Sequence, residues 1–435
     1  MRGLARLSRF CHFVLLGSRI FGGFAMRVRS GGSSGNAAHA ENVECWGIDP
    51  TGSFFVLASG IGANAERASQ MVCETVIQTL LPHRESIEKM ASGDHPDSCQ
   101  NLMETLCNAM RRAERRLLDY MSTAHETKSV VSCDLVYLAN GTAYIAHIGN
   151  QRVYLLRGDT GRLLTIDHSA YEYWRSQGKP ESALANPAYR LRVTRALGIG
   201  GTAEIDTLQL DLRTGDRIVV CSQGAHQHFQ NATHLAQLYR MMEPQRVADY
   251  LIQYAFDRGC QTCASVICIE ILEPGVRNAF VETDSRITAL EQICFFRDLS
   301  YQEMLQIMPI TYEKGVEAGR EIIHEGDAGD VLYILVDGKC EVSNGGVRIA
   351  ILEPGCSFGE LSLVDRQPRS ATVKAIGACR VLMIRAGDFE HLTMSGALAV
   401  KLLWNVAHEL SERIRKSSET IRLQGVRLLE NGILN

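Results

Sequence analysis

A short stretch near residue 360 concentrates residue types that can hold a phosphate. Its sequence is Phe358-Gly-Glu-Leu-Ser-Leu-Val-Asp-Arg-Gln-Pro-Arg-Ser-Ala-Thr-Val373. Gly359 lets the backbone approach a ligand closely, because glycine has no Cβ. Glu360, Leu361 and Ser362 can begin one helical turn whose free N–H groups form an anion site. The carboxylate of Glu360 can in addition accept a hydrogen bond from a ribose hydroxyl.

The second half of the same stretch supplies the positive charge. Arg369 presents a planar guanidinium whose paired N–H groups match phosphate oxygens. Ser370 and Ala371 are small, so the backbone N–H groups that follow stay accessible. One guanidinium balances the single charge of a cyclic phosphodiester. The stretch therefore predicts a pocket for a compact, singly charged phosphate ligand.

The elements around this stretch are β-rich. Residues 291–396 read as short strands separated by turns, and residues 397–435 as mostly helical. A charged segment with Pro274-Gly275 predicts a linker over residues 273–290. A larger domain over residues 41–272 precedes it, and residues 1–40 are predicted to be a flexible N-terminal segment in which Gly31–Asn36 is rich in Gly and Ser.

The larger domain mixes both periods of hydrophobic residues. Apolar residues at helical spacing predict amphipathic helices over residues 65–81 and 102–117. Residues 135–148 predict a β-hairpin, since Asn140-Gly141 accepts the positive φ of a tight turn. The chain is therefore predicted to be α+β, with a strand-dominated N-terminal domain and a second β-rich domain.

Composition places the chain among globular proteins. It has 435 residues, 46% of them hydrophobic and 22% charged, which favours two domains. The formal net charge of −4 gives no basic surface for nucleic acid, and no stretch is long enough to span a membrane. The 14 cysteines stand in apolar contexts and behave as small buried hydrophobes, so we expect a reducing, cytoplasmic location.

The first 25 residues allow two interpretations. They combine several Arg with a short apolar run from Phe10 to Gly17 and contain no Asp or Glu. The favoured interpretation is an over-extended or disordered start, with Met26 as a plausible second initiation site. The alternative is a targeting peptide.

The phosphate stretch closely resembles the phosphate-binding cassette of the cyclic nucleotide-binding domain family, which includes regulatory subunits of cyclic-AMP-dependent kinase and the bacterial catabolite activator protein. The resemblance covers about residues 295–389 and includes Gly326, Gly329, Tyr333-Ile-Leu-Val-Asp-Gly338 and Leu352-Glu-Pro-Gly355. It implies a β jelly roll with flanking helices and carries the ligand role over to seven positions: Gly359, Glu360, Leu361, Ser362, Arg369, Ser370 and Ala371. The implied ligand is cyclic AMP, with cyclic GMP as the alternative.

The N-terminal domain resembles metal-dependent phosphatases of the PPM (type 2C) family, in their bacterial form. The motifs occur in the family's order over about residues 42–271. They are Phe54-Phe-Val-Leu-Ala-Ser-Gly-Ile-Gly62, Ala146-His-Ile-Gly-Asn-Gln-Arg-Val-Tyr154, Asp167-His-Ser169, Thr194-Arg-Ala-Leu-Gly198, Gly215-Asp-Arg-Ile-Val-Val-Cys-Ser-Gln-Gly224 and Ala264-Ser-Val-Ile267. The resemblance implies two antiparallel sheets with helices on both sides, and hydrolysis of phosphoserine and phosphothreonine by two metal ions.

The chain departs from this family where the family holds its metal ions. The family's Asp residues fall at Glu44, Ser59, Asn150, Gln223 and Thr262, although Gly60 of the Asp-Gly pair remains, and the phosphate-binding Arg falls at His39. Two divalent ions about 4 Å apart repel by roughly 17 kcal/mol at an effective dielectric of 20. One Glu cannot offset that repulsion, so we expect no metal and no phosphatase activity. If the domain were active, the metal would be Mg²⁺ or Mn²⁺.

Three further groups receive non-catalytic interpretations. Cys260 and Cys263 form a Cys-x-x-Cys pair without a second pair nearby, which argues against zinc. His226 and His228 are interpreted as a polar loop. Ser222 has no recognisable base partner in the sequence, so it is not predicted to be a nucleophile.

These observations favour a signalling protein without catalytic activity. In this hypothesis a cyclic nucleotide shifts the C-terminal helices and changes how the phosphatase-like domain binds a phosphoprotein or a kinase. Two alternatives stay open, namely an active nucleotide-controlled serine/threonine phosphatase and a scaffold with a nucleotide sensor. Apolar residues also repeat at seven-residue spacing along the end of the chain: Leu403, Ala407, Leu410, Ile414, Ile421 and Leu428. A helix packed on its own barrel is favoured there, and a homodimer through these helices is the alternative.

Overall fold

The computed structural model describes residues 26–37, 43–49, 52–91, 96–124, 129–177, 179–239, 242–274, 307–359 and 368–393, with isolated positions between 290 and 304 and between 398 and 415. The chain divides into two compact units, Met1–Val281 and Glu282–Asn435. Each unit has its own sheets and its own hydrophobic core and is described by itself.

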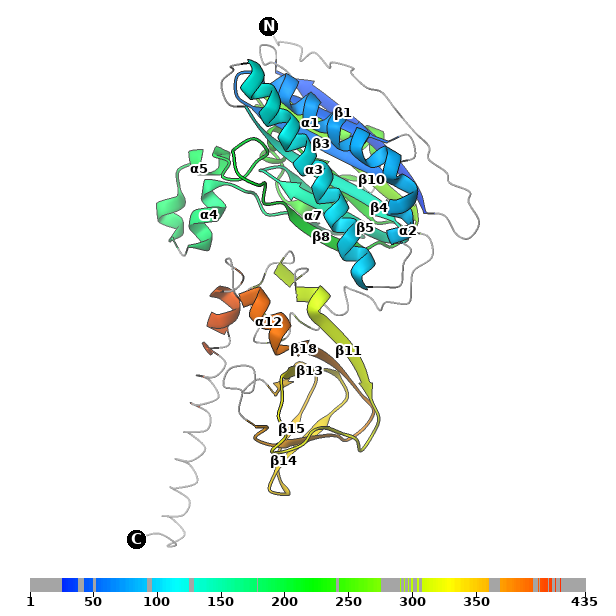
Figure 1. Cartoon of the computed structure of the whole chain (residues 1–435), viewed down its shortest axis with the longest axis vertical. Coiled ribbons are helices and arrows are strands. Elements are labelled where there is room, and N and C mark those ends of the chain that lie inside the picture. Colours follow the sequence, from blue (N-terminus) through cyan, green and yellow to red (C-terminus); the bar gives the residue numbers. More distant parts are fainter. Residues whose placement is uncertain are drawn as a thin grey trace. The chain divides into compact units, whose positions relative to one another are not determined.

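Two antiparallel five-stranded sheets build the N-terminal unit (Figure 1). The first sheet has the order β1-β10-β9-β6-β7, and the second has the order β2-β3-β4-β5-β8. The strands are β1 (Arg27–Asn36), β2 (Glu44–Ile48), β3 (Phe54–Ile61), β4 (Val130–Ala139), β5 (Thr142–Ile148), β6 (Arg152–Arg157), β7 (Thr160–Leu163), β8 (Asp206–Asp211), β9 (Arg217–Cys221) and β10 (Cys263–Glu273).

Helices cover the outer face of each sheet. Phe54, Val56 and Ala58 of β3 share a core with apolar residues of the helices over the second sheet, which are α1 (Ala65–Leu80), α2 (Arg84–Ala91) and α3 (Pro96–Ala124). The first sheet packs in the same way against α7 (Ala232–Tyr239) and α8 (Pro244–Asp257). The predicted α+β class, with two antiparallel sheets and helices on both sides, is confirmed.

The predicted hairpin is present where the sequence placed it. β4 pairs with β5, and the turn between them holds Asn140 at φ 47° and Gly141 at φ 74°. Positive φ at both central residues is the requirement that Asn-Gly meets in a two-residue turn.

The prediction that residues 1–40 are flexible is wrong for Arg27–Asn36. This Gly/Ser-rich segment is β1, and it pairs with β10 along its whole length. Its glycines are needed for close packing rather than for flexibility. A Cβ on Gly31 would lie 2.5 Å from the backbone of Gln245 in α8, and one on Gly32 would lie 2.7 Å from the Trp46 ring. Residues 1–25 lie outside the described part of the chain.

The C-terminal unit contains two four-stranded antiparallel sheets, with the orders β11-β18-β13-β16 and β12-β17-β14-β15. Their strands are β11 (Thr311–Val316), β12 (Glu321–Ile323), β13 (Val331–Asp337), β14 (Cys340–Asn344), β15 (Val347–Leu352), β16 (Ser357–Phe358), β17 (Thr372–Ala375) and β18 (Cys379–Arg385). A shared core that includes Leu335, Val373 and Val381 joins the two sheets. The predicted jelly roll is thus present as a two-sheet β-sandwich.

Helical segments follow the sandwich. α12 (Ala386–Thr393) comes directly after β18, and the described positions between 398 and 415 are also helical. Leu398 and Leu402 are buried, whereas Val400, Leu403 and Trp404 are exposed. In the part of the chain that the structure describes, no helix is both long and apolar enough to cross a bilayer.

Candidate functional site

A row of polar residues crosses the second sheet where the sequence placed the degenerate metal positions. Glu44 on β2 is the register partner of Ser59 on β3, and Ser59 is in turn the partner of Ser132 on β4. On β3, Ser59 alternates with Phe54, Val56 and Ala58, which face the helices, so its side chain faces the other sheet. The row therefore forms a polar layer between the two sheets.

Glu44 is the acceptor at the centre of this polar layer. Its carboxyl is hydrogen-bonded by the hydroxyls of Ser265, Ser222 and Ser59, and the residue is 6% exposed. Burial raises the pKa of the Glu44 carboxyl to about 7, although these three hydrogen bonds lower it. The pairing with Ser222 was not predicted, because the two residues lie far apart in the chain. Ser222 is fully buried, so this contact does not make it an accessible nucleophile.

A chain of hydroxyls extends the network away from Glu44. The indole N–H of Trp46 donates to Ser34 Oγ at 2.7 Å, and Ser34 Oγ lies 2.8 Å from Ser265 Oγ. Trp46, on β2, is thereby tied to both sheets.

The amide positions of the layer are bonded to each other. Asn150 Nδ2 donates to Gln223 Oε1 at 2.9 Å, and Ser132 Oγ donates to Asn150 Oδ1 at 3.1 Å. His226 Nε2 lies 2.9 Å from the Asn150 carbonyl oxygen. Both amide oxygens therefore already accept a hydrogen bond from a neighbouring side chain of this layer.

Two of the remaining sequence-predicted positions, Gly60 and Thr262, are described, and neither has a charged side chain. Gly60 donates its N–H to the Val43 carbonyl at 2.8 Å, and a Cβ there would overlap the Ala65 backbone. Thr262 is exposed, and its hydroxyl lies 3.1 Å from where a Cβ on Gly224 would stand. His39 lies outside the described residues.

This donor set does not fit a pair of divalent ions. At the five positions where the family has Asp, the chain has Glu44, Ser59, Asn150, Gln223 and Thr262, so only Glu44 carries a carboxylate. Hard divalent cations need several oxygen ligands and balancing negative charge. Among the described residues, no group of three or more His, Cys, Asp or Glu is arranged to hold a metal ion, and Cys260 and Cys263 are not disulfide-bonded.

A buried pair of His147 and Asp134, which was not predicted from the sequence, lies beside the layer. His147 Nδ1 lies 2.6 Å from Asp134 Oδ1, and His147 Nε2 lies 2.9 Å from the Ile166 carbonyl oxygen. Both ring nitrogens of His147 thus face oxygen atoms. One proton is needed between Nδ1 and the Asp134 carboxylate, and a second on Nε2 to bond to the Ile166 carbonyl oxygen. Burial opposes charge on both groups. It raises the pKa of Asp134, whereas beside Asp134 the pKa of His147 is raised in spite of burial.

The other two histidines of the region are neutral. Burial lowers the pKa of His226 to about 4, and it lowers the pKa of His168 to about 4. His168 Nδ1 accepts from the Gly149 N–H at 3.0 Å, so its Nε2 carries the proton and donates to Asp206. His226 is not a loop residue as the sequence suggested, because it ends the short helix α6 (Gln223–His226).

In the C-terminal unit, Arg369 occupies a cradle of backbone. The residue is 8% exposed, and its terminal nitrogens donate to the carbonyl oxygens of Gly359 at 2.8 Å and Val331 at 2.9 Å. A Cβ on Gly329 would overlap the guanidinium, and one on Gly359, whose φ is 78°, would lie 2.5 Å from it. Two glycines thus make the space in which the positive charge is held.

The other predicted ligand positions are only partly described. Ser370 is exposed, and its carbonyl accepts from Asn344 Nδ2 at 2.8 Å, while Ala371 is half-buried. Glu360, Leu361 and Ser362 lie outside the described residues. Within the described part, Arg369 contacts Gly359, which directly follows β16, while Ser370 and Ala371 lie between Arg369 and the start of β17.

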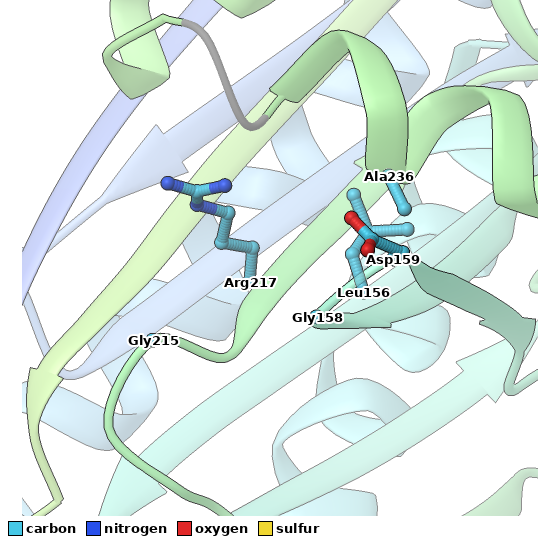
Figure 2. A pocket seen from close by; sticks show the side chains of 6 residues that line it. All are labelled: Leu156, Gly158, Asp159, Gly215, Arg217 and Ala236. Atoms are coloured by element: carbon cyan, nitrogen blue, oxygen red, sulfur yellow. The ribbon is translucent and has the colours of Figure 1, made fainter.

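A separate surface hollow of about 220 Å³ lies on the N-terminal unit, lined by Leu156, Gly158, Asp159, Gly215, Arg217 and Ala236 (Figure 2). None of these residues belongs to the polar layer. The Arg217 guanidinium is held by Glu270 at 3.0 Å, which gives it a structural role between β9 and β10.

Comparison with known families agrees with this division. Residues 313–395 match the family model described as "Cyclic nucleotide-binding domain", and residues 21–173 match "Protein phosphatase 2C". The first range contains Gly359, Arg369, Ser370 and Ala371, and the second contains Glu44, Ser59 and Asn150. The second range also begins before β1, in agreement with the strand found there.

Similar curated proteins match short parts of the chain. A cGMP-dependent protein kinase of Toxoplasma gondii is 35% identical over 128 residues, which is 28% of this chain and 13% of the kinase. A cAMP-dependent protein kinase regulatory subunit of Yarrowia lipolytica is 34% identical over 101 residues, which is 23% of this chain and 27% of that subunit. The chain thus spans well under a third of the length of either relative.

Among solved structures, the serine/threonine phosphatase PstP/Ppp of Mycobacterium tuberculosis is 22% identical, with a TM-score of 0.48 over 56% of this chain and 98% of the other. The match to the two family models, together with the two units found in the structure, leads to one conclusion. The chain carries an N-terminal protein phosphatase 2C domain and a C-terminal cyclic nucleotide-binding domain.

Proposed function

We propose that the protein is a cyclic nucleotide-responsive signalling protein whose phosphatase-type domain binds a partner instead of hydrolysing phosphoesters. The observation that carries the first half is the Arg369 cradle, in which a buried guanidinium is held between two glycines. The paired N–H groups of a guanidinium match the oxygens of a phosphate, and a cyclic phosphodiester carries a single negative charge. The remaining ligand contacts are assigned to Gly359, Glu360, Leu361, Ser362, Ser370 and Ala371.

Cyclic AMP is the proposed ligand, and cyclic GMP is the alternative. One of the two relatives described above is named as cGMP-dependent and the other as cAMP-dependent, so they do not discriminate between the ligands. Calorimetry with both nucleotides on the full chain answers the question directly. The variant Arg369→Ala should abolish binding of either nucleotide, whereas Arg380→Ala, which removes a half-exposed arginine of β18, should bind like the parent. Equal binding by parent and Arg369→Ala would place the ligand elsewhere.

The second half of the proposal, loss of hydrolysis, rests on the polar layer. Four of the five positions at which the family has Asp are uncharged here, and the amides of Asn150 and Gln223 bond to each other. Without paired metal ions the domain lacks the bridging water that attacks phosphorus in two-metal hydrolysis. We therefore expect no turnover of para-nitrophenyl phosphate or of a phosphopeptide in Mg²⁺ or Mn²⁺. Metal-dependent turnover that is lost in Glu44→Gln would establish the alternative, an active nucleotide-controlled phosphatase.

The nucleotide would act by selecting between arrangements of the C-terminal helices. A ligand shifts an equilibrium only by its differential affinity for the two states. The partner would be a phosphoprotein or a kinase, and a pull-down with and without nucleotide separates this regulated binding from a passive scaffold. The cysteines in the described part of the chain form no disulfide, which supports the proposal of a cytoplasmic location.

A homodimer through the C-terminal helices is the alternative to a helix packed on its own barrel. Leu403 and Ala407, which open the seven-residue repeat, are exposed, and so are the neighbouring Val400 and Trp404. Leu398 and Leu402 are buried, so one apolar face of the helix is covered and a second apolar face is exposed. Light scattering coupled to size exclusion tests this state, since a monomeric mass at all concentrations would exclude it.

A further inference from the structure

A small helical protrusion of the N-terminal unit carries an exposed surface that the polar layer does not use. It comprises α4 (Ala170–Ser176), a 3₁₀ turn (Glu181–Leu184) and α5 (Ala188–Leu191), and we call it the flap. Figure 1 shows α4 and α5 together at one side of the sheets, and the two helices pack against each other. The ends of the flap are tied together, because the Ala170 N–H donates to the Arg192 carbonyl at 2.8 Å.

The flap exposes three cations that have no carboxylate partner among the described residues. Lys179 Nζ lies 3.4 Å from the centre of the Trp174 ring, and the Arg190 guanidinium lies 3.5 Å above the Tyr171 ring. Arg192 follows directly on α5 and is also exposed. A guanidinium stacked on a ring keeps its N–H groups in its own plane, where they remain available to an anion.

Apolar side chains lie among these cations. Tyr173 is 51% exposed and stands edge-on to Trp174, while Leu191 is 54% exposed between Arg190 and Arg192. The described acidic side chain of the flap, Glu172, forms an ion pair with Arg175, with 2.6 Å between Glu172 Oε2 and Arg175 Nη2. The flap therefore offers positive charge and apolar contact together on a chain whose net charge is negative.

We propose that the flap is a docking surface for an acidic segment of a partner protein. Carboxylates of the segment pair with Lys179, Arg190 and Arg192, and one or two of its apolar side chains pack on Tyr173 and Leu191. A polypeptide is favoured over nucleic acid, because three cations on an otherwise acidic chain do not provide the electrostatic footprint of a nucleic-acid binder. The inference rests on the proposed function, since it names the surface through which the phosphatase-type domain reaches its partner.

The test measures peptide binding to the full chain. The probe is a fluorescein-labelled peptide of four Glu-Glu-Leu repeats, followed by fluorescence anisotropy, and its counterpart has Gln in place of Glu. The parent should bind the Glu peptide, should bind the Gln peptide at least tenfold more weakly, and should lose affinity as NaCl is raised from 50 to 300 mM. The triple variant Lys179→Gln/Arg190→Gln/Arg192→Gln should weaken binding of the Glu peptide about tenfold, as expected for three exposed pairs.

A matched control removes three other exposed arginines. The variant Arg67→Gln/Arg112→Gln/Arg115→Gln on α1 and α3 changes the net charge equally and should bind like the parent. A second flap variant, Tyr173→Ser/Leu191→Ser, keeps every charge and should also weaken binding. Far-ultraviolet circular dichroism should match the parent for all variants, because the substituted side chains are on the surface.

Several outcomes overturn the proposal. These are equal weakening by both triple variants, no binding by the parent, tighter binding of a single-stranded oligonucleotide than of the Glu peptide, and dissociation of a dimer by the flap variant. The last outcome would make a second copy of the chain the occupant. Cyclic AMP titration of the same samples keeps the two proposals apart, because nucleotide binding with failed peptide binding removes only the docking surface.

Discussion

Replacing Glu44 with Gln should stabilise the N-terminal unit above neutral pH. The carboxyl has a pKa of about 7 in the folded protein, against 4.5 when it is not buried. Below pH 4.5 it is protonated in both states, so it contributes no pH dependence. Between pH 4.5 and pH 7 the unfolded chain releases a proton that the folded protein keeps, and folding stability therefore falls. Above pH 7 the loss is constant.

The size of this loss follows from the pKa difference. At about 1.4 kcal/mol per pH unit, the window costs about 3 kcal/mol of folding free energy. Glutamine has the same shape, cannot ionise, and can still bond to the hydroxyls of Ser59, Ser222 and Ser265. We expect Glu44→Gln to be more stable than the parent by about 2–3 kcal/mol at pH 8 and by less than about 1 kcal/mol at pH 5.

Tryptophan fluorescence in urea is a suitable assay. The chain has three tryptophans, and Trp46 belongs to the Glu44 network while Trp404 belongs to the other unit. A Trp404→Phe background therefore reports on the N-terminal unit. The variant Glu74→Gln makes the same chemical change at an exposed position of α1 and should show no pH-dependent gain.

Two results would refute the reasoning. One is a Glu44→Gln variant that is less stable than the parent at pH 8, since the ionised carboxylate would then be stabilising. The other is a rise in stability of the parent, but not of Glu44→Gln, on addition of Mn²⁺. A ligand that binds only the folded state stabilises it in proportion to the logarithm of its concentration, so such a rise would reveal a metal site at Glu44.

Three further predictions concern single positions. Gly329→Ala should push the Arg369 guanidinium out of its cradle and lower nucleotide affinity at least tenfold in calorimetry, whereas Gly315→Ala, which has open space around its Cβ, should leave affinity unchanged. Gly32→Ala should destabilise the N-terminal unit by about 1–3 kcal/mol in urea because its Cβ meets Trp46, and Gly377→Ala is the control with open space. His226→Gln should reduce acid sensitivity, because a histidine whose pKa falls to about 4 on folding contributes stability that is present above pH 6.5 and lost as the pH falls toward 4; an unchanged loss of stability over that window would contradict this.

Secondary structure was predicted correctly where a few consecutive residues determine it. Asn140-Gly141 fixed a hairpin, because the turn depends on two adjacent residues that tolerate positive φ. The spacing from Ala65 to Leu80 predicted α1 because an amphipathic helix needs only one apolar stripe. Both signals are contained in a few consecutive residues.

The errors arose where the cause was distant in the sequence. Gly31–Asn36 reads as a flexible linker by composition, yet its glycines admit Gln245 and Trp46, which no local window contains. In the same way, Ser222 meets Glu44, and Arg369 needs Gly329, only after the strands have paired. The resemblance to the cyclic nucleotide-binding family could have identified Gly329 as part of the site. It could not show why glycine is needed there, which is that a Cβ would overlap the Arg369 guanidinium.

The segment around His168 connects the polar layer to the flap. The His168 N–H donates to the Gly149 carbonyl at 2.6 Å, and the Thr194 N–H donates to the His168 carbonyl at 2.8 Å. His168 directly precedes Ser169, whose hydroxyl caps α4. Gly149 directly precedes Asn150 of the layer, and His168 lies two residues before the first residue of α4. The hydrogen bond between Gly149 and His168 therefore links the layer to the flap. The segment that positions the flap is held by backbone hydrogen bonds and by the His168 imidazole, so these contacts do not depend on carboxylates at the positions of the layer.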